Sequence, residues 1–320
     1  MSPFRGDEEN VRRACMKEHL AAADLQRRSL CDKIFMLIDI RVMRYSENDI
    51  GGNNMRTVRY EYLRPQEILD AQAEKSIVYL PLGPLEWHGP AMPFGTDPLA
   101  IEAAARKIAE RAGGVVLPTL YVGTEREREP ELLDALGFER DQYVVGQDFP
   151  KNTLPSFYMR EEVFSLVVRE YLRMLVNQKY KLIVILNGHG ATNQCNVLDR
   201  LAVEFSNETD SKVVVMMANP EDDSMAFEGH ATKSETAVQM YLDEANVDLS
   251  KLPAKPERLK NCDWGIDGGN VYRLQPNADK TVEDECDPRD ATAEIGREFF
   301  EKGVDVAVAR VNRVWEELQK

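Results

Sequence analysis

The sequence predicts an α/β protein of three layers, in which a mostly parallel sheet lies between helices. Two observations predict this class. Continuous apolar runs, such as Ile77–Leu82 and Leu182–Leu186, are typical of strands buried on both faces. Segments of helical composition alternate with these runs along the chain, and such alternation favours a parallel sheet with helices on both sides.

The first half of the expected fold contains two strands and two helices. The run Ile77–Leu82 is the first strand, and residues 98–112 follow as a helix with Pro98 in its first turn. Residues 115–117 form a short apolar strand. The helix expected at 161–177 is supported by apolar side chains at helical spacing along its whole length.

The second half repeats this order. The strand Leu182–Leu186 precedes a helix expected at 194–206, for which Asn193 is the expected N-cap. The run 212–217, rich in valine, is a third buried strand. Helices are expected at 233–242, where Thr232 or Ser234 can act as the cap, and at 292–301.

A change of composition divides the chain before this α/β region. Residues 45–54 are rich in glycine and asparagine and are typical of a linker. We therefore expect an N-terminal extension at residues 1–54, helical or flexible, and one domain at residues 55–320.

Composition limits the possible partners and compartment. The 320 residues have a formal net charge of −15, which disfavours nucleic acid and anionic membrane surfaces. The five cysteines form no C-x-x-C pair, and no secretory signal or membrane-spanning run is visible. These features predict a cytoplasmic protein with reduced cysteines.

Three of the four histidines lie in short segments that also contain glycine and a carboxylate or an amide. Glu86 and His88 follow the first strand and, two residues apart in extended chain, can face the same point. His189 follows the strand at 182–186 and is expected at the carboxyl edge of the sheet. Ligand-binding residues in parallel sheets usually lie at this edge. His230 precedes the helix whose first turns contain Glu235. Imidazole and carboxylate groups of this kind bind divalent cations.

Each segment also has a simpler interpretation. Glu86 and His88 could be hydrogen-bonded loop residues, and Asp97 could be the N-cap of the helix that contains Pro98. His230 and Glu235 could lie at the start of a surface helix.

Two other segments have their own interpretations. Gly188-x-Gly190-x-x-Asn193 is one glycine short of a dinucleotide-binding pattern, and no acidic residue follows at the required distance. The alternating charges of residues 125–129 are typical of a solvated surface.

Taken together, four motifs over residues 60–305 resemble those of the creatininase (creatinine amidohydrolase) family. Residues 83–97 resemble G-[ST]-x-E-Q-H-G-P-H-L-P-x-G-T-D, and residues 187–193 resemble N-G-H-G-G-N. Residues 230–236 resemble H-A-G-x-x-E-T. Residues 286–288 and 291–296 resemble a later G-D-P and A-x-x-E-x-G.

This resemblance implies a three-layer α/β/α fold and two divalent metal ions, with Zn, Mn or Fe as candidates. Glu86, His88, Asp97 and His189 match the family's metal ligands, with Asp97 as the bridge. Creatininase has a further ligand glutamate where this chain has alanine, and we assign that role to Glu235 as a hypothesis. His230 is then the expected catalytic proton donor. The resemblance also implies a homo-oligomer.

The chain departs from the family pattern at positions that line the creatinine pocket. Trp87 replaces a glutamine, Gly190 replaces an aromatic residue, Thr232 replaces a glycine, and a tryptophan before the third motif is absent. The expected activity is therefore hydrolysis of a non-peptide or cyclic amide C–N bond in a small molecule other than creatinine. A deformylase, a small-peptide peptidase and a non-catalytic relative are the alternatives.

Overall fold

The computed structural model describes residues 56–320, apart from 137–138, 144–153, 221–229 and 260–280. The extension expected at residues 1–54 lies outside the described residues. Within the described part of the chain, no helix combines the length and the apolar character that crossing a membrane requires.

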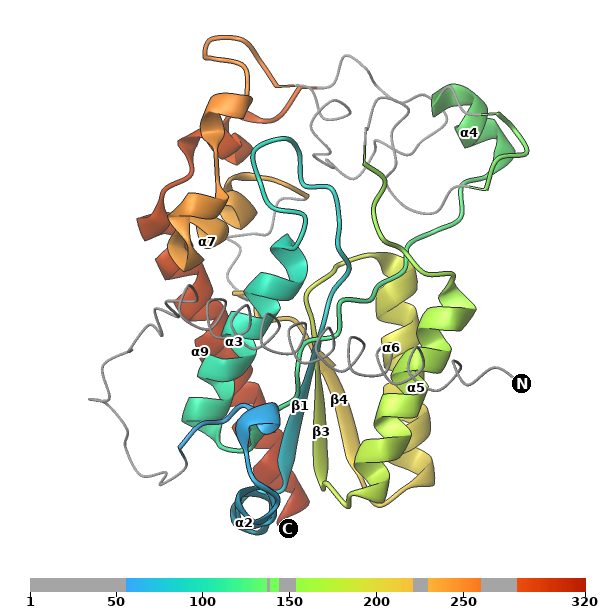
Figure 1. Ribbon diagram of the computed structural model, residues 1–320, viewed down its shortest axis with the longest axis vertical. Helices are drawn as coiled ribbons and strands as arrows, with labels where there is room; N and C mark the ends of the chain where they lie inside the picture. The colour runs from blue at the N-terminus through green and yellow to red at the C-terminus, as the bar shows by residue number, and fades with distance from the viewer. Residues whose placement is uncertain (1–55, 137–138, 144–153, 221–229, 260–280) are drawn as a thin grey trace, which may run out of the picture. The chain divides into compact units, whose positions relative to one another are not determined.

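The core of the fold is a parallel sheet of four strands in the order β2-β1-β3-β4 (Figure 1). The strands are β1 (Ile77–Leu82), β2 (Val115–Val116), β3 (Leu182–Asn187) and β4 (Lys212–Met216). β1 pairs with β2 and β3, and β3 pairs with β4, always in parallel. Every residue of β1 and β3 is buried, which explains why these strands are continuous apolar runs.

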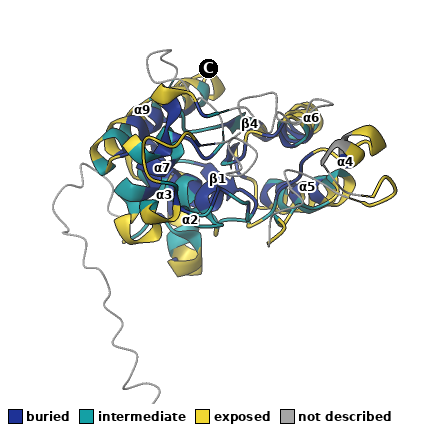
Figure 2. Ribbon diagram, turned by 90° about the horizontal axis from the view of Figure 1, so that it is seen from above, coloured by how far each residue is buried: buried dark blue, intermediate teal, exposed yellow. Residues whose placement is uncertain are grey.

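Helices cover both faces of the sheet, as Figures 1 and 2 show, so the predicted three-layer class is confirmed. One face carries α3 (Thr96–Ala112), α7 (Lys233–Leu242) and α9 (Ala293–Leu318). The other carries α5 (Glu161–Asn177) and α6 (Thr192–Glu208). Successive β1 side chains alternate between the two cores: Tyr79 packs with α3 and α9, whereas Val78 packs with α5 and α6.

Several short elements complete the described fold. Two further helices, α2 (Pro65–Glu74) and α4 (Pro130–Leu136), were not predicted. The 3₁₀ turns are Tyr60–Tyr62, Glu244–Asn246, Leu249–Lys251, Asp284–Cys286 and Pro288–Asp290.

The last helix is much longer than predicted. α9 continues from Ala293 to Leu318, whereas the sequence predicted an end at 301. Two glycines inside α9 allow unusually close packing: a Cβ at Gly296 would lie 1.9 Å from the carbonyl oxygen of Ala237, and one at Gly303 would lie 2.0 Å from that of Ala218. These glycines serve backbone contacts, so they do not end the helix.

The N-cap predicted at Asn193 is wrong, and so is the alternative interpretation of Asp97 as an N-cap. α3 begins at Thr96 with Gly95 at the N-cap, so Asp97 is the second helical residue and caps nothing. α6 begins at Thr192, and Asn193 instead donates from Nδ2 to Glu161 Oε2 over 2.9 Å. In both cases the helix starts earlier than the capping rule suggested, and the side chain contacts another residue: Asp97 contacts His189 and Asn193 contacts Glu161.

The charged run at 125–129 is not wholly solvated. Glu125 and Arg128 are each 7% exposed, and Glu125 Oε1 accepts a hydrogen bond from the backbone N–H of Arg126. The prediction of a solvated surface is therefore wrong for these two residues.

Candidate metal centre

The histidine-containing segments meet at the carboxyl edge of the sheet. Glu86 and His88 lie in the loop after β1, and His189 follows β3 directly. Asp97 lies in the first turn of α3. A Cβ at Gly188 would be 2.7 Å from the backbone oxygen of Asp97, so glycine there permits α3 to approach β3.

The third segment comes from the start of α7. His230 lies in the loop before the helix, and Glu235 lies in its first turn. The His230 side chain is 10% exposed and that of Glu235 15%, so neither belongs to a surface helix start.

The six residues form three overlapping groups whose potential ligand atoms lie within 4.8 Å of one another: Glu86–Asp97–His189, His88–Asp97–Glu235 and Glu86–His88–His230. His189 Nδ1 lies 2.9 Å from Glu86 Oε2 and 3.1 Å from Asp97 Oδ2. His88 Nε2 lies 3.1 Å from Asp97 Oδ1 and 3.7 Å from Glu235 Oε2. Asp97 therefore offers one oxygen to each of the first two groups.

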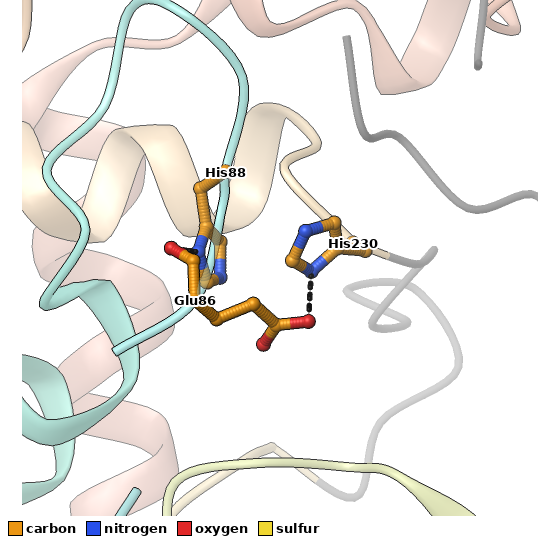
Figure 3. A group of neighbouring side chains, drawn as sticks. All are labelled: Glu86, His88 and His230. Atoms are coloured by element: carbon orange, nitrogen blue, oxygen red, sulfur yellow. Dashed lines mark hydrogen bonds and ion pairs between the residues drawn. The ribbon is translucent and has the colours of Figure 1, made fainter. Parts of the chain in front are cut away.

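Backbone carbonyls fix the tautomers of two rings. His88 Nδ1 donates to the carbonyl oxygen of Glu86 over 3.1 Å, which leaves Nε2 free to face the carboxylates. His230 Nε2 donates to the carbonyl oxygen of Trp87, so its Nδ1 faces Glu86 Oε1 at 3.6 Å (Figure 3). The rings of His88 and His230 lie 4.2 Å apart.

The donor set fits divalent cations. Glu86 Oε2 and His88 Nε2 are buried, and neither has a hydrogen-bond partner among the described residues. Buried polar atoms in folded proteins almost always have a partner. Convergent carboxylate oxygens and imidazole nitrogens are suited to Zn, Mn or Fe.

Without an ion, the site is a dense cluster of interacting charges. Burial raises the pKa of Glu86, but His189 and His230 outweigh it and hold this pKa well below the usual range. Burial lowers the pKa of His88, yet Asp97 and Glu235 raise it to about 10. The pKa of His189 is likewise raised well above its ordinary value, because Glu86 and Asp97 oppose the effect of burial.

The two groups from the third segment differ from the others. Burial raises the pKa of Glu235 to about 7, although His88 counteracts it. Burial lowers the pKa of His230, and the opposing charge of Glu86 does not fully offset this effect. His230 is therefore the ring of the cluster that is neutral near physiological pH.

Sequence reasoning missed the residues that support this centre. Asn187 holds the His189 backbone from both sides: its Nδ2 donates to the His189 carbonyl over 2.7 Å, and its Oδ1 accepts from the His189 N–H. Gln194 Nε2 also donates to Asn187 Oδ1, and Gln194 Oε1 accepts from the N–H of Thr124. Tyr158 donates its hydroxyl hydrogen to Glu86 Oε1 over 2.5 Å.

Only one of these supporting residues had a signal in the sequence. Asn187 stands inside the second motif. Tyr158 precedes α5 in a segment without metal-ligating residues, so no pattern pointed to it.

Comparison with known proteins identifies related chains. A sequence model of the creatininase family, described as creatinine amidohydrolase, matches residues 61–311. Creatinine amidohydrolase of Pseudomonas putida is 26% identical over 144 residues, which cover 44% of this chain and 49% of that protein. The match thus spans about half the length of this curated relative.

Solved structures show the same fold. A crystal structure of creatinine amidohydrolase (creatininase) has a TM-score of 0.59 at 21% identity, over 82% of this chain and 99% of that one. A mutant creatininase of the Zn-Zn type has a TM-score of 0.60 at 20% identity, with the same coverage. A structure named creatininase Mn has a TM-score of 0.59 at 20% identity, over 81% and 99%.

Proposed function

The chain belongs to the creatininase family, and from this premise we propose that it is an amidohydrolase that uses two divalent metal ions. It would cleave a C–N bond, other than a peptide bond, in a small linear or cyclic amide. The observation that carries this proposal is the position of Asp97, whose two oxygens belong to two different groups of histidine and carboxylate.

These groups would provide two ion positions. Glu86, Asp97 and His189 would hold one ion, and His88, Asp97 and Glu235 would hold the other. When bound, such cations acidify water and stabilise negative charge on an amide oxygen. Because both positions share Asp97, the two ions would act on one substrate group.

His230 would transfer a proton to the departing nitrogen. Its Nε2–H is held by the Trp87 carbonyl, so only Nδ1 can exchange a proton with the centre. A neutral ring can accept a proton from water at Nδ1 and pass it to the departing nitrogen. An amide nitrogen is a poor leaving group, so bond cleavage depends on this proton.

The proposed substrate is an amide other than creatinine. Trp87, Gly190 and Thr232 depart from the family pattern at positions that line the creatinine pocket. Glu86, His88, Asp97 and His189 of the same motifs match ligand positions of the family, which supports a changed substrate with conserved metal chemistry.

Metal analysis followed by substrate profiling tests the proposal. We expect the purified protein, reloaded with Zn²⁺ or Mn²⁺ after chelation, to hold two ions per chain, and the Asp97→Asn variant to lose tight binding of both. Formamides, lactams and short peptides would then be compared as substrates. Preferential turnover of formamides or peptides would replace the proposed reaction with that of a deformylase or a peptidase, and a native chain that holds no ion would contradict the hydrolase proposal.

A further inference from the structure

A segment just before α5 is bonded to the loop that carries Glu86. The N–H of Phe157 donates to the carbonyl oxygen of Leu85 over 2.8 Å, and Ser156 Oγ accepts from the N–H of Trp87 over 3.0 Å. Ser156 and Phe157 thus bond the residues on either side of Glu86. This pairing fixes the position of the next residue, Tyr158, relative to the carboxylate.

The Glu86 carboxylate has a different neighbour for each oxygen. Oε1 accepts the hydrogen bond from the Tyr158 hydroxyl at 2.5 Å and also lies 3.6 Å from His230 Nδ1, which carries no hydrogen in the neutral ring because Nε2 donates to the Trp87 carbonyl. Oε2 lies 2.9 Å from His189 Nδ1. The rings of Tyr158 and His189 lie 5.7 Å apart. Glu86 is only 1% exposed, so bulk solvent has little access to Oε1.

We propose that Tyr158 is a positioning residue that directs Glu86 Oε2 toward His189 and thereby sets metal retention at the Glu86–Asp97–His189 position. This inference rests on the proposed function, since it assumes that Glu86 is a metal ligand. With Oε1 engaged by the hydroxyl, Glu86 binds through Oε2 alone. Without the hydroxyl, the Glu86 carboxylate can rotate. Metal binding must then order the carboxylate, which reduces the free energy of metal binding.

The effect should be selective for one of the two positions. At the other position, the His88 ring is oriented by the Glu86 carbonyl, and Glu235 Oε2 accepts from the N–H of Ala231 over 2.6 Å. Those contacts do not involve the Tyr158 hydroxyl. Loss of the hydroxyl should therefore lower the affinity of the Glu86–Asp97–His189 position for its ion and leave the affinity of the other position unchanged. A general loss of stability would lower both affinities.

The test is a calorimetric titration of metal-free Tyr158→Phe protein with Zn²⁺. The phenylalanine keeps the ring and removes only the hydroxyl, and the melting temperature of the metal-free variant checks that it is folded. We expect two binding steps in the unmodified protein. In the variant we expect one step to weaken about 10–100-fold, as is typical when an outer partner of a ligand is removed, while the other stays unchanged.

A matched control is available on α7. Tyr241 also donates its hydroxyl to a glutamate, Glu301 in α9, over 3.2 Å, and neither residue belongs to the cluster. Tyr241→Phe removes the same type of bond and should leave both titration steps unchanged.

A spectroscopic readout complements the titration. In Co²⁺-loaded Tyr158→Phe protein, the released Oε1 can join the coordination of the ion, which should change the visible absorption of one of the two ions.

The outcomes separate this inference from the proposed function. If the unmodified protein binds no metal, the proposed function fails. If it binds two ions and Tyr158→Phe gives the same two affinities and the same Co²⁺ spectrum, the metal centre stands and the role of Tyr158 is refuted. Equal weakening of both steps would also refute it, because that result indicates a general structural role.

Discussion

Replacement of Gly296 by alanine tests whether the close packing of α9 on α7 stabilises the fold at the helix that carries Glu235. A Cβ at this position would lie 1.9 Å from the carbonyl oxygen and 2.3 Å from the carbonyl carbon of Ala237. Real Cβ atoms essentially never approach within 3.0 Å of another heavy atom, so the helices must separate. Ala237 lies two residues after Glu235, and the separation would therefore move a proposed ligand.

Two effects of opposite sign compete in this substitution. Alanine is the better helix former by about 0.8–1.0 kcal/mol, so propensity alone predicts stabilisation. Overpacking in a close contact costs about 1–3 kcal/mol and occasionally more, and here the obstacle is backbone that cannot adopt another rotamer. We expect the cost to be at or above the upper end of this range, with a net loss of about 2 kcal/mol.

Thermal unfolding of the metal-free protein provides the assay. A loss of about 2 kcal/mol should lower the melting temperature by about 4–8 °C. Gly190→Ala is the control, because a Cβ there meets only Met217 Cε, at 4.0 Å. An unchanged or higher melting temperature for Gly296→Ala would refute the packing argument, since it would mean that helix propensity outweighs the contact.

Two further predictions concern the centre itself. His230→Asn should keep both ions by elemental analysis and lose about 10²–10⁴-fold in turnover, because the proton donor is removed while the ligands remain; undiminished turnover would exclude His230 from the reaction. Metal binding at pH 7 should release about one proton each from His88 and His189, because the pKa of His88 is raised to about 10 and that of His189 well above its ordinary value. Titration in two buffers of different ionisation enthalpy measures this number, and a value near zero would contradict the predicted charge state. The raised pKa of His88 stabilises the metal-free fold fully below pH ~6.5, and this stabilisation is lost as the pH rises through about 10.

The parts of the fold with a strong local pattern could be predicted from the sequence. β1 and α7 have the predicted bounds, and the fully buried β1 could be predicted because such a strand is a continuous apolar run. The end of α9 could not be predicted, since it depends on which backbone faces Gly303 rather than on the glycine itself. The start of α3 was misjudged for a related reason: Thr96 Oγ1 donates to the Pro93 carbonyl, and this loop contact has no motif.

The histidines and carboxylates of the candidate site could be predicted from the sequence, because metal binding requires these residue types. Imidazole and carboxylate groups after buried strands point to a metal centre, and the structure brings Glu86, His88, Asp97 and His189 together there. The supporting contacts were not predictable. Tyr158 reaches Glu86 from 72 residues away along the chain, and any hydroxyl at the right distance would satisfy the same oxygen.

The departures from the family pattern lie where the metal clusters do not need a particular side chain. Trp87 contributes its backbone carbonyl to His230, while its ring packs edge-on against Phe94 with centroids 6.2 Å apart. A different side chain at this position therefore leaves the tautomer of His230 intact.

The other two positions that depart from the family pattern, Thr232 and Gly190, also lie outside the metal clusters. Thr232 occupies the N-cap position of α7, and its hydroxyl pairs with that of Ser234. Gly190 is exposed and has only Met217 Cε, at 4.0 Å, near the place of its missing Cβ. Since all three positions lie beside the ligands without joining their clusters, substrate preference can change there while the ligand geometry stays fixed.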